Sequence, residues 1–309
     1  MLPLLIGGLV LFLYAINQLS EVMQDVFSQK AKAIIEKYTS NIFSAILIGT
    51  ILTVLLDSSS AVIILVIIFI NAKNLNFRQA IGIIMGANIG TTFSSQIIAL
   101  DIGKYSVLPL FIGLVFEIFG KGKRFKLLGQ VILYFGMLFF GLFIIEQSVL
   151  PLHDSPLFID WITRIEQNYI QGALIGGLIT LIMQSSSGTV GMAIVLGKQQ
   201  LITAAGGIAI MLGAELGTCS DTLIATINGS RQALKAGLFH VIFNFLTITI
   251  GLLVFGPFVR MIMYISSGMD IGTLIANAHM IFNILGVIIF LPFVGLAIKG
   301  LNRLLPDRI

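Results

Sequence analysis

The stretch Leu55-Leu56-Asp57-Ser58-Ser59-Ser60 places four polar residues in the middle of a long apolar run. A second stretch of the same kind, Ile182-Met183-Gln184-Ser185-Ser186-Ser187, follows later in the chain at an offset of 185 − 58 = 127. Hydrocarbon penalises every unpaired hydroxyl, amide or carboxylate, so a polar cluster inside such a run indicates a functional site. The same offset carries Thr53 onto Thr180, Gly86-Ala87 onto Gly213-Ala214, and Gly90-Thr91 onto Gly217-Thr218. The chain is therefore expected to contain two copies of one unit.

Composition places the chain among the polytopic all-α membrane proteins. Of 309 residues, 57% are hydrophobic and 10% are charged, which leaves too little polar surface to coat a globular domain in water. The net charge of +4 falls in short clusters between apolar segments, so we expect a lipid bilayer around the chain and no nucleic-acid partner. The segment Met1–Ile6 lacks a basic leader and an Ala-x-Ala site, and we expect it to begin the first membrane helix.

Each polar stretch falls within a segment that is too long for one straight crossing. As a single helix, residues 41–71 would span about 46 Å, against a hydrocarbon core of about 30 Å. We expect this segment to break at the serines and form a re-entrant hairpin, and residues 169–197 to form a second one. The segment 86–92, rich in glycine and threonine, is expected to be a locally unwound helix.

The predicted organisation has four parts. They are repeat 1 over residues 1–120, a basic cytoplasmic linker over 121–126, repeat 2 over 127–256, and an additional transmembrane helix with a short basic tail over 257–309.

The distribution of Lys and Arg selects between two topologies. If the serine segments are hairpins, each repeat crosses the membrane three times, the repeats are inverted, and one more helix follows. With the N-terminus outside, 14 of the 18 basic residues then face the cytoplasm. If the serine segments cross instead, the repeats are parallel and the count becomes 8 against 10. The positive-inside rule favours inverted repeats in a plasma or inner membrane, with the C-terminus cytoplasmic.

The serine triplets are the candidate anion site. They directly precede a second half-helix, where hydroxyls and free backbone N–H groups converge at the positive end of the helix dipole. Inverted symmetry would bring both ends together near the midplane, as in secondary transporters. The alternative is that small serines only allow helices to pack closely. The candidate residues are Ser58, Ser59, Ser60, Ser185, Ser186 and Ser187.

Three matched pairs each contain one carboxylate, and buried carboxylates need a cation or a proton. The pairs are Asp57 with Gln184, Asn88 with Glu215, and Ser94 with Asp221. No Arg or Lys lies in these motifs, so a multiply charged anion could enter only with cations. A capping or interhelical hydrogen bond remains the alternative for Glu215 and Asp221. The candidate sodium-binding residues are Asp57, Gln184, Asn88, Thr91, Thr92, Glu215, Thr218 and Asp221.

These motifs resemble a known family. Asp57-Ser58-Ser59-Ser60 with Gly86–Thr92, and Gln184-Ser185-Ser186-Ser187 with Gly213–Thr218, are similar to the duplicated Gln-Ser-Ser-Ser and Gly-Ala-Asn-Ile-Gly-Thr signatures of the type II sodium/phosphate cotransporters. The resemblance covers about Pro3 to Ile298. It implies import of inorganic phosphate by alternating access, with the serines around phosphate and the glutamine, asparagine and threonine positions around sodium, the coupling ion. No other cofactor is implied.

Two departures from the family pattern bear on sodium stoichiometry, proton dependence and anion choice. Asp57 stands where the family has Gln, and Glu215-Leu216 stands where the second copy usually has Asn-Ile.

A His-x-x-Phe-Asn pattern occurs twice near the end of the chain. Each His lacks carboxylate or Cys neighbours at ligand spacing, so we expect interhelical hydrogen bonds and no metal site besides sodium. The supporting residues are Thr53, Thr180, His240, Asn244, His279 and Asn283.

Two other classes of function compete with a symporter. A serine hydrolase needs one nucleophile and would not need the triplet twice, so we do not expect an enzyme. A channel also uses broken helices and polar rings, and only uphill accumulation separates it from a transporter. The sequence leaves open the choice among small anions and whether chains associate as a homo-oligomer.

Overall fold

The computed structural model describes residues 2–39, 41–72, 74–100, 102–227 and 229–306, and these form helices joined by short connections. The side chains of residues 27–32, 36, 37, 153, 157, 161, 164–167 and 221 lie outside this description. The first half contains α1 (Leu2–Tyr38), α2 (Ile42–Leu56), α3 (Ser59–Asn71), α4 (Phe77–Ile98), η1 (Gly103–Tyr105) and α5 (Val107–Phe119). The second half contains α6 (Lys123–Val149), η2 (Leu150–Asp154), α7 (Pro156–Gln167), α8 (Tyr169–Met183), α9 (Ser186–Lys198), α10 (Ala204–Gly217), α11 (Cys219–Thr226) and α12 (Arg231–Leu253). The chain ends with α13 (Phe255–Ile265), α14 (Ile271–Phe290), η3 (Leu291–Phe293) and α15 (Val294–Leu304).

Six segments in the described ranges are long and apolar enough to cross a membrane, which confirms a polytopic membrane protein. They are Leu2–Val26, Phe77–Ile98, Lys123–Leu152, Ala204–Thr226, Arg231–Leu253 and Ile271–Leu304. The three crossings predicted for repeat 1 require one more helix between α4 and residue 120, and α5 occupies this place. This helix has 13 residues and is therefore about 20 Å long, shorter than the hydrocarbon core. It packs against α6.

The helix breaks at the two polar stretches have matching geometry. α2 and α8 have 15 residues each, and α3 and α9 have 13 each. Asp57 ends α2 with φ 50° and ψ 30°, and Gln184 ends α8 with φ 51° and ψ 32°. The left-handed region is unfavourable for residues other than glycine. Its use by an Asp and a Gln at matched positions indicates that the surrounding structure holds both breaks in place.

Glycines allow the broken helices to approach α4 and α10 closely. A Cβ at Gly86 would overlap the carbonyl oxygen of Ile46 in α2, and a Cβ at Gly213 would overlap that of Ala173 in α8. These two contacts are related by the same offset as the sequence motifs. The expectation of an unwound segment at 86–92 is wrong, because α4 is helical from Phe77 to Ile98. Its glycines serve helix packing, and only the second copy is interrupted, at Thr218 between α10 and α11.

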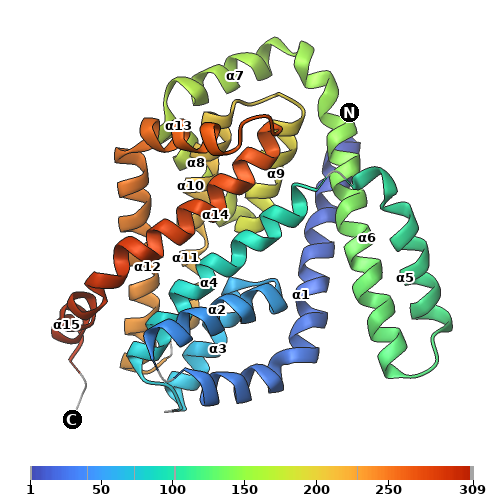
Figure 1. Ribbon diagram of the computed structural model, residues 1–309. Coiled ribbons are helices and arrows are strands. Elements are labelled where there is room, and N and C mark those ends of the chain that lie inside the picture. The colour runs from blue at the N-terminus through green and yellow to red at the C-terminus, as the bar shows by residue number, and fades with distance from the viewer. Residues whose placement is uncertain (1, 40, 73, 101, 228, 307–309) are drawn as a thin grey trace.

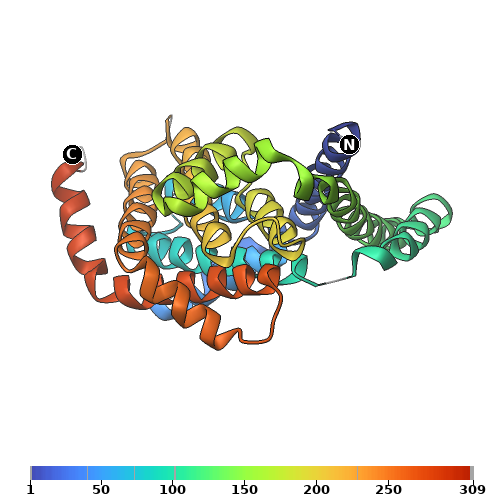
Figure 2. The same cartoon turned by 90° about the horizontal axis from the view of Figure 1, so that it is seen from above.

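The helices are arranged around two apolar clusters. One joins α1, α6, α9, α10, α13 and α14, and the other joins α2, α3, α4, α12 and the end of the chain. Figure 1 shows the first turns of α1 running alongside α6, and Figure 2 shows α5 and α6 at one edge of the molecule with α15 at the opposite edge. The outer surfaces are apolar: Leu174, Leu178 and Ile182 form an exposed stripe on α8, as expected of helices that contact lipid.

The connections gather at two ends of the molecule. In Figure 1 the α3–α4 and α5–α6 connections lie at the lower end, and α7 and α13 lie at the upper end. The predicted topology places Arg78 and residues 121–126, at the lower end, in the cytoplasm, and it places Arg260, in α13, outside. The arrangement is compatible with the predicted topology, and the side on which each end lies stays a prediction.

Candidate functional site

The first serine of each triplet caps the helix that follows it. Ser58 Oγ accepts a hydrogen bond from the Ala61 N–H at 3.1 Å, and Ser185 Oγ accepts one from the Gly188 N–H at 3.0 Å. Both serines have extended backbone angles, as N-cap residues do. Each capped start carries the positive end of a helix dipole, which favours an anion beside it.

Both triplets line a single cavity of about 100 Å³. The described lining residues are Ile16, Asn17, Ser20, Asp57, Ser58, Ser59, Ser60, Thr91, Gln184, Ser185, Ser186, Ser187 and Thr218. Ten of these thirteen residues form five pairs related by the repeat offset, such as Thr91 with Thr218. The structure thus brings together the starts of both second half-helices, which are far apart in the chain.

The remaining three lining residues come from α1 and were missed by sequence reasoning. Asn17 and Ser20 lie one helical turn apart, and Ser20 Oγ donates to the Leu56 carbonyl at 3.1 Å. Leu56 is the last residue of α2, so this hydrogen bond satisfies a carbonyl that the helix break leaves without an intrahelical partner. The available signal was the i, i+3 spacing of two polar residues within the first apolar helix.

Asp57 is the one ionisable side chain among the described lining residues of the cavity. Its carboxylate accepts a hydrogen bond from Ser94 Oγ at 2.5 Å. Asp57, Ser94 and Ser187 also border a second, mainly apolar cavity of about 170 Å³ between α1, α2, α4 and α6. A charge-assisted hydrogen bond to Ser94 fixes the carboxylate at the junction of the two cavities. Sequence reasoning noted Ser94 only as the partner position of Asp221.

Two of the predicted sodium-binding threonines face the cavity. The Thr91 hydroxyl donates to the Ala87 carbonyl at 3.0 Å, and the Thr218 hydroxyl donates to the Glu215 carbonyl at 2.9 Å. Because each proton is used within the helix, the oxygen lone pairs are free to face a cation. Gln184 lines the cavity as well. The side chain of Asp221 lies outside the described residues.

The other predicted sodium-binding residues lie outside the cavity lining. Asn88, Thr92 and Glu215 are buried, with exposed fractions of 4%, 0% and 4%. Asn88 Nδ2 donates to Asn244 Oδ1 at 2.5 Å, and Asn244 Nδ2 donates to the Glu215 carbonyl at 3.0 Å. Thr92 donates to the Ile89 carbonyl. These residues connect α4, α10 and α12 close to the cavity.

Both predicted supporting histidines make interhelical hydrogen bonds. His279 Nε2 lies 2.6 Å from Glu215 Oε1, and its Nδ1 lies 2.7 Å from Ser95 Oγ. This buried acid–imidazole pair joins α14 to α10 and α4. It lies one turn from the cavity, because Ser95 follows Thr91 by four residues and Glu215 precedes Thr218 by three. Asn283 donates to the His279 carbonyl at 3.1 Å.

His240 is bound in the same manner on α12. Its Nδ1 lies 2.9 Å from the Thr222 hydroxyl, and its Nε2 lies 3.2 Å from Asn244 Nδ2. Both ring nitrogens of both histidines therefore have partners outside the triplets, and neither imidazole is placed to activate a triplet serine. Among the residues that the structure describes, no group of three His, Cys, Asp or Glu side chains could hold a metal ion.

Thr53 and Thr180 differ despite their matched positions. Thr180 Oγ1 donates to Thr189 Oγ1 at 2.7 Å, and Thr189 in turn donates to the Ser185 carbonyl. The position matching Thr189 is Val62, and the buried Thr53 Oγ1 has no hydrogen-bond partner among the described atoms. The second break is therefore tied to α8 by a hydroxyl chain that the first lacks.

The fold and this cavity define a polytopic membrane protein that encloses a polar site between two broken helix pairs, an arrangement typical of membrane transporters. The chain belongs to the Na+/Pi-cotransporter family, whose model matches residues 11–147 and 155–271.

Three relatives show how far the similarity extends. The uncharacterized protein YqeW of Bacillus subtilis is 27% identical over 300 residues, with 97% of each chain covered. YjbB of Salmonella typhimurium, named for a proposed export of inorganic phosphate, is 24% identical over 98% of this chain, which spans 56% of that protein. The human sodium-dependent phosphate transport protein 2B is 38% identical over 101 residues, which are 32% of this chain and 15% of that protein. No solved structure matches the chain.

Proposed function

We propose that the chain is a sodium-coupled transporter that carries inorganic phosphate across the membrane by alternating access. The observation that carries this proposal is the cavity between the two serine triplets. Its described lining contains the starts of two helices, seven serines and one carboxylate, and no basic residue. Helix N-termini and hydroxyls are donors suited to a phosphate group.

The charge of the cavity supports coupling to cations. A monovalent anion 4 Å from the Asp57 carboxylate would be repelled by about 4 kcal/mol at an effective dielectric constant of 20. A cation bound between the two anions attracts both of them, so the net electrostatic interaction becomes favourable. Asp57, Gln184, Thr91 and Thr218 offer oxygen ligands to sodium at the cavity wall, and we assign the first cation to this group. The roles of Asn88, Thr92 and Glu215 in sodium binding stay predictions. They are supported because these residues lie within one helical turn of Thr91 or Thr218, which line the cavity.

We further propose that the two halves are inverted-topology repeats with re-entrant hairpins at 41–71 and 169–197. The matched breaks at Asp57 and Gln184 and the matched glycine contacts of Gly86 and Gly213 support this proposal. In such a fold the site remains fixed between the repeats while the surrounding helices open to one side or the other. The proposed parts are 1–120, 121–126, 127–256 and 257–309.

The direction of transport should follow the sodium gradient. Under an inward gradient, coupling drives import, as the resemblance to sodium/phosphate cotransporters implies. The name of YjbB points to export, which the same mechanism permits when the driving gradients are reversed, because coupling fixes only the ratio of the transported ions.

Reconstitution into proteoliposomes tests the proposal. Radiolabelled phosphate should accumulate against its gradient when sodium is high outside, and preloaded phosphate should leave the vesicles when sodium is high inside. Choline in place of sodium should abolish both movements. Arsenate, sulfate and small carboxylates, added as competitors, define the choice of anion. Sodium-independent movement that only equilibrates phosphate would contradict the proposal and indicate a channel.

A further inference from the structure

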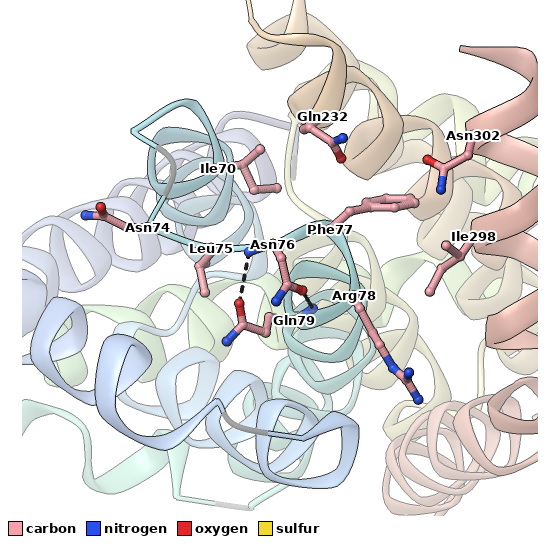
Figure 3. Close-up of a pocket in the computed structure, with 10 residues that line it drawn as sticks. All are labelled: Ile70, Asn74, Leu75, Asn76, Phe77, Arg78, Gln79, Gln232, Ile298 and Asn302. Atoms are coloured by element: carbon pink, nitrogen blue, oxygen red, sulfur yellow. Dashed lines mark hydrogen bonds between the residues drawn. The ribbon is translucent and has the colours of Figure 1, made fainter. Parts of the chain in front are cut away.

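A larger cavity of about 660 Å³ lies apart from the serine triplets, where the α3–α4 connection meets α12 and α15 (Figure 3). The described lining residues are Ile70, Asn74, Leu75, Asn76, Phe77, Arg78, Gln79, Gln232, Ile298 and Asn302. None of these ten is acidic, and Arg78 is the one ionisable side chain among them. The formal charge of the described lining is therefore positive.

Two of the lining amides hold the start of α4 in place. Asn76 Oδ1 accepts from the Gln79 N–H, and Gln79 Oε1 accepts from the Asn76 N–H, both at 2.9 Å, as the dashed lines in Figure 3 show. This reciprocal capping fixes the first turn of α4, which carries Arg78. The Arg78 side chain is exposed, and no acidic side chain that the structure describes pairs with it. A guanidinium on a rigid turn is well suited to bind a phosphate group.

A second cation, Lys235 of α12, contacts α15. Lys235 is fully buried, with an exposed fraction of 0%, and its Nζ donates to Asn302 Oδ1 at 2.8 Å. This bond orients the Asn302 amide with its oxygen toward Lys235, which leaves the Nδ2 donors for other partners. Arg231, Lys299 and Arg303 adjoin lining residues in the sequence. The described cavity lining itself carries one positive charge, that of Arg78, and no acidic side chain, which favours an anionic ligand.

The floor of the cavity is apolar. Ile70, Leu75 and Phe77 are buried, with exposed fractions of 4%, 5% and 7%, and Ile298 continues the apolar surface onto α15. The cavity lies at the end of α3, a short apolar helix, and of the span that contains α14 and α15. An anionic headgroup with an attached hydrocarbon chain matches both the positive wall and the apolar floor.

We propose that this cavity binds the phosphate group of an anionic phospholipid, with Arg78 paired to the phosphate and the acyl chain on the floor formed by Leu75, Phe77 and Ile298. The proposal does not depend on the transported substrate, because the two cavities share no lining residue. A soluble phosphate ester offers the same anionic group without the chain, and the experiment separates these two sources.

Binding can be measured by native mass spectrometry on the purified full-length chain in a neutral detergent. The probes are short-chain phosphatidylglycerol, phosphatidylcholine with the same acyl chains, and glycerol 3-phosphate. Phosphatidylglycerol should bind about tenfold more tightly than phosphatidylcholine, since the choline ammonium of the latter offsets the attraction between its phosphate and Arg78. Arg78→Gln should weaken phosphatidylglycerol binding about tenfold and phosphatidylcholine binding by less, so the preference between the two lipids should be lost.

Lys299→Gln is the matched control, because it removes one positive charge beside the cavity from a residue that does not line it. It should change the affinity less than about twofold, as expected for an exposed charge. Ile298→Trp should weaken both lipids by filling the cavity, and it tests the site independently of Arg78. Glycerol 3-phosphate binding that depends on Arg78 and equals that of the lipid would keep the phosphate site but overturn its assignment to a lipid. Equal binding of the two lipids, or equal effects of Arg78→Gln and Lys299→Gln, would overturn the proposal.

Discussion

The hydroxyl of Ser94 in α4 donates a 2.5 Å hydrogen bond to the carboxylate of Asp57, at the point where α2 ends in a left-handed turn. This contact holds a negative charge at the wall of the cavity that both serine triplets share. The second copy has a neutral amide, Gln184, at the matched position. The proposed cation site is therefore charged on one side of the pseudosymmetric cavity and neutral on the other.

Removing this charge should alter the requirement for sodium. In Asp57→Asn, the repulsion between the carboxylate and the substrate is lost, so phosphate binding at low sodium should strengthen and its sodium dependence should become less steep. Gln184→Glu adds a carboxylate at the matched position and should have the opposite effect. Phosphate binding to the purified variants over a matrix of phosphate and sodium concentrations measures both. An unchanged sodium dependence in both variants would show that Asp57 does not take part in cation binding.

The pair formed by His279 and Glu215 should be important for stability. Each side chain is buried, and removal of one partner leaves the other without its interhelical bond. Glu215→Gln or His279→Gln is expected to destabilise the protein by about 3 kcal/mol. The double variant should lose less than the sum of the two single losses. Unfolding of the three purified variants, followed by circular dichroism, gives the comparison, and strictly additive losses would show that the 2.6 Å contact contributes little.

The two matched threonines should respond differently to valine. Thr53→Val removes a buried hydroxyl that has no partner among the described atoms, so it should be neutral or slightly stabilising. Thr180→Val breaks the hydrogen bond to Thr189 and should destabilise by about 1 kcal/mol. Thermal unfolding of the two variants is the measurement. A larger loss for Thr53→Val would mean that its hydroxyl binds a ligand or water.

The proposed orientation can be tested with an impermeant maleimide. Single cysteines in place of Lys123 and Ser155, in a Cys219→Ala background, lie at the beginning of α6 and beyond its end. Reagent added outside intact cells should label position 155 and leave position 123 unlabelled until the membrane is permeabilised. The reverse pattern would invert the topology. Labelling of both positions from outside would show that α6 does not separate them by a bilayer.

Sequence reasoning could place the helix breaks because two independent signals agreed at each one. A polar cluster within a long apolar run marks a break, and each run is too long for one straight membrane crossing. The fixed offset between the two copies then predicted equivalent surroundings for Thr91 and Thr218, and both line the cavity. The local chemistry of the polar clusters and the duplication of the motifs can both be recognised in the sequence without knowledge of tertiary contacts.

Other features depend on contacts that no local pattern encodes. The glycines of α4 suggested an unwound segment, but a glycine also permits close helix packing, and only the approach of Ile46 to Gly86 distinguishes the two. The contribution of α1 to the cavity and the pairing of His279 with Glu215, 64 residues apart, required the folded arrangement. The pairing of Asp57 with Ser94 likewise joins residues from two different helices.

The central claim is that both serine triplets bind one phosphate ion. Ser59→Ala and Ser186→Ala each remove one hydroxyl donor to a charged group, worth roughly 1.5–3 kcal/mol, so the phosphate affinity should fall about ten- to hundredfold. The two losses should be similar in size, because the residues occupy matched positions on one cavity. Equilibrium binding of radiolabelled phosphate at saturating sodium, to the two purified and folded variants, is the most direct measurement. A parallel loss in both variants is the predicted result, and parental affinity in either one would contradict the shared site.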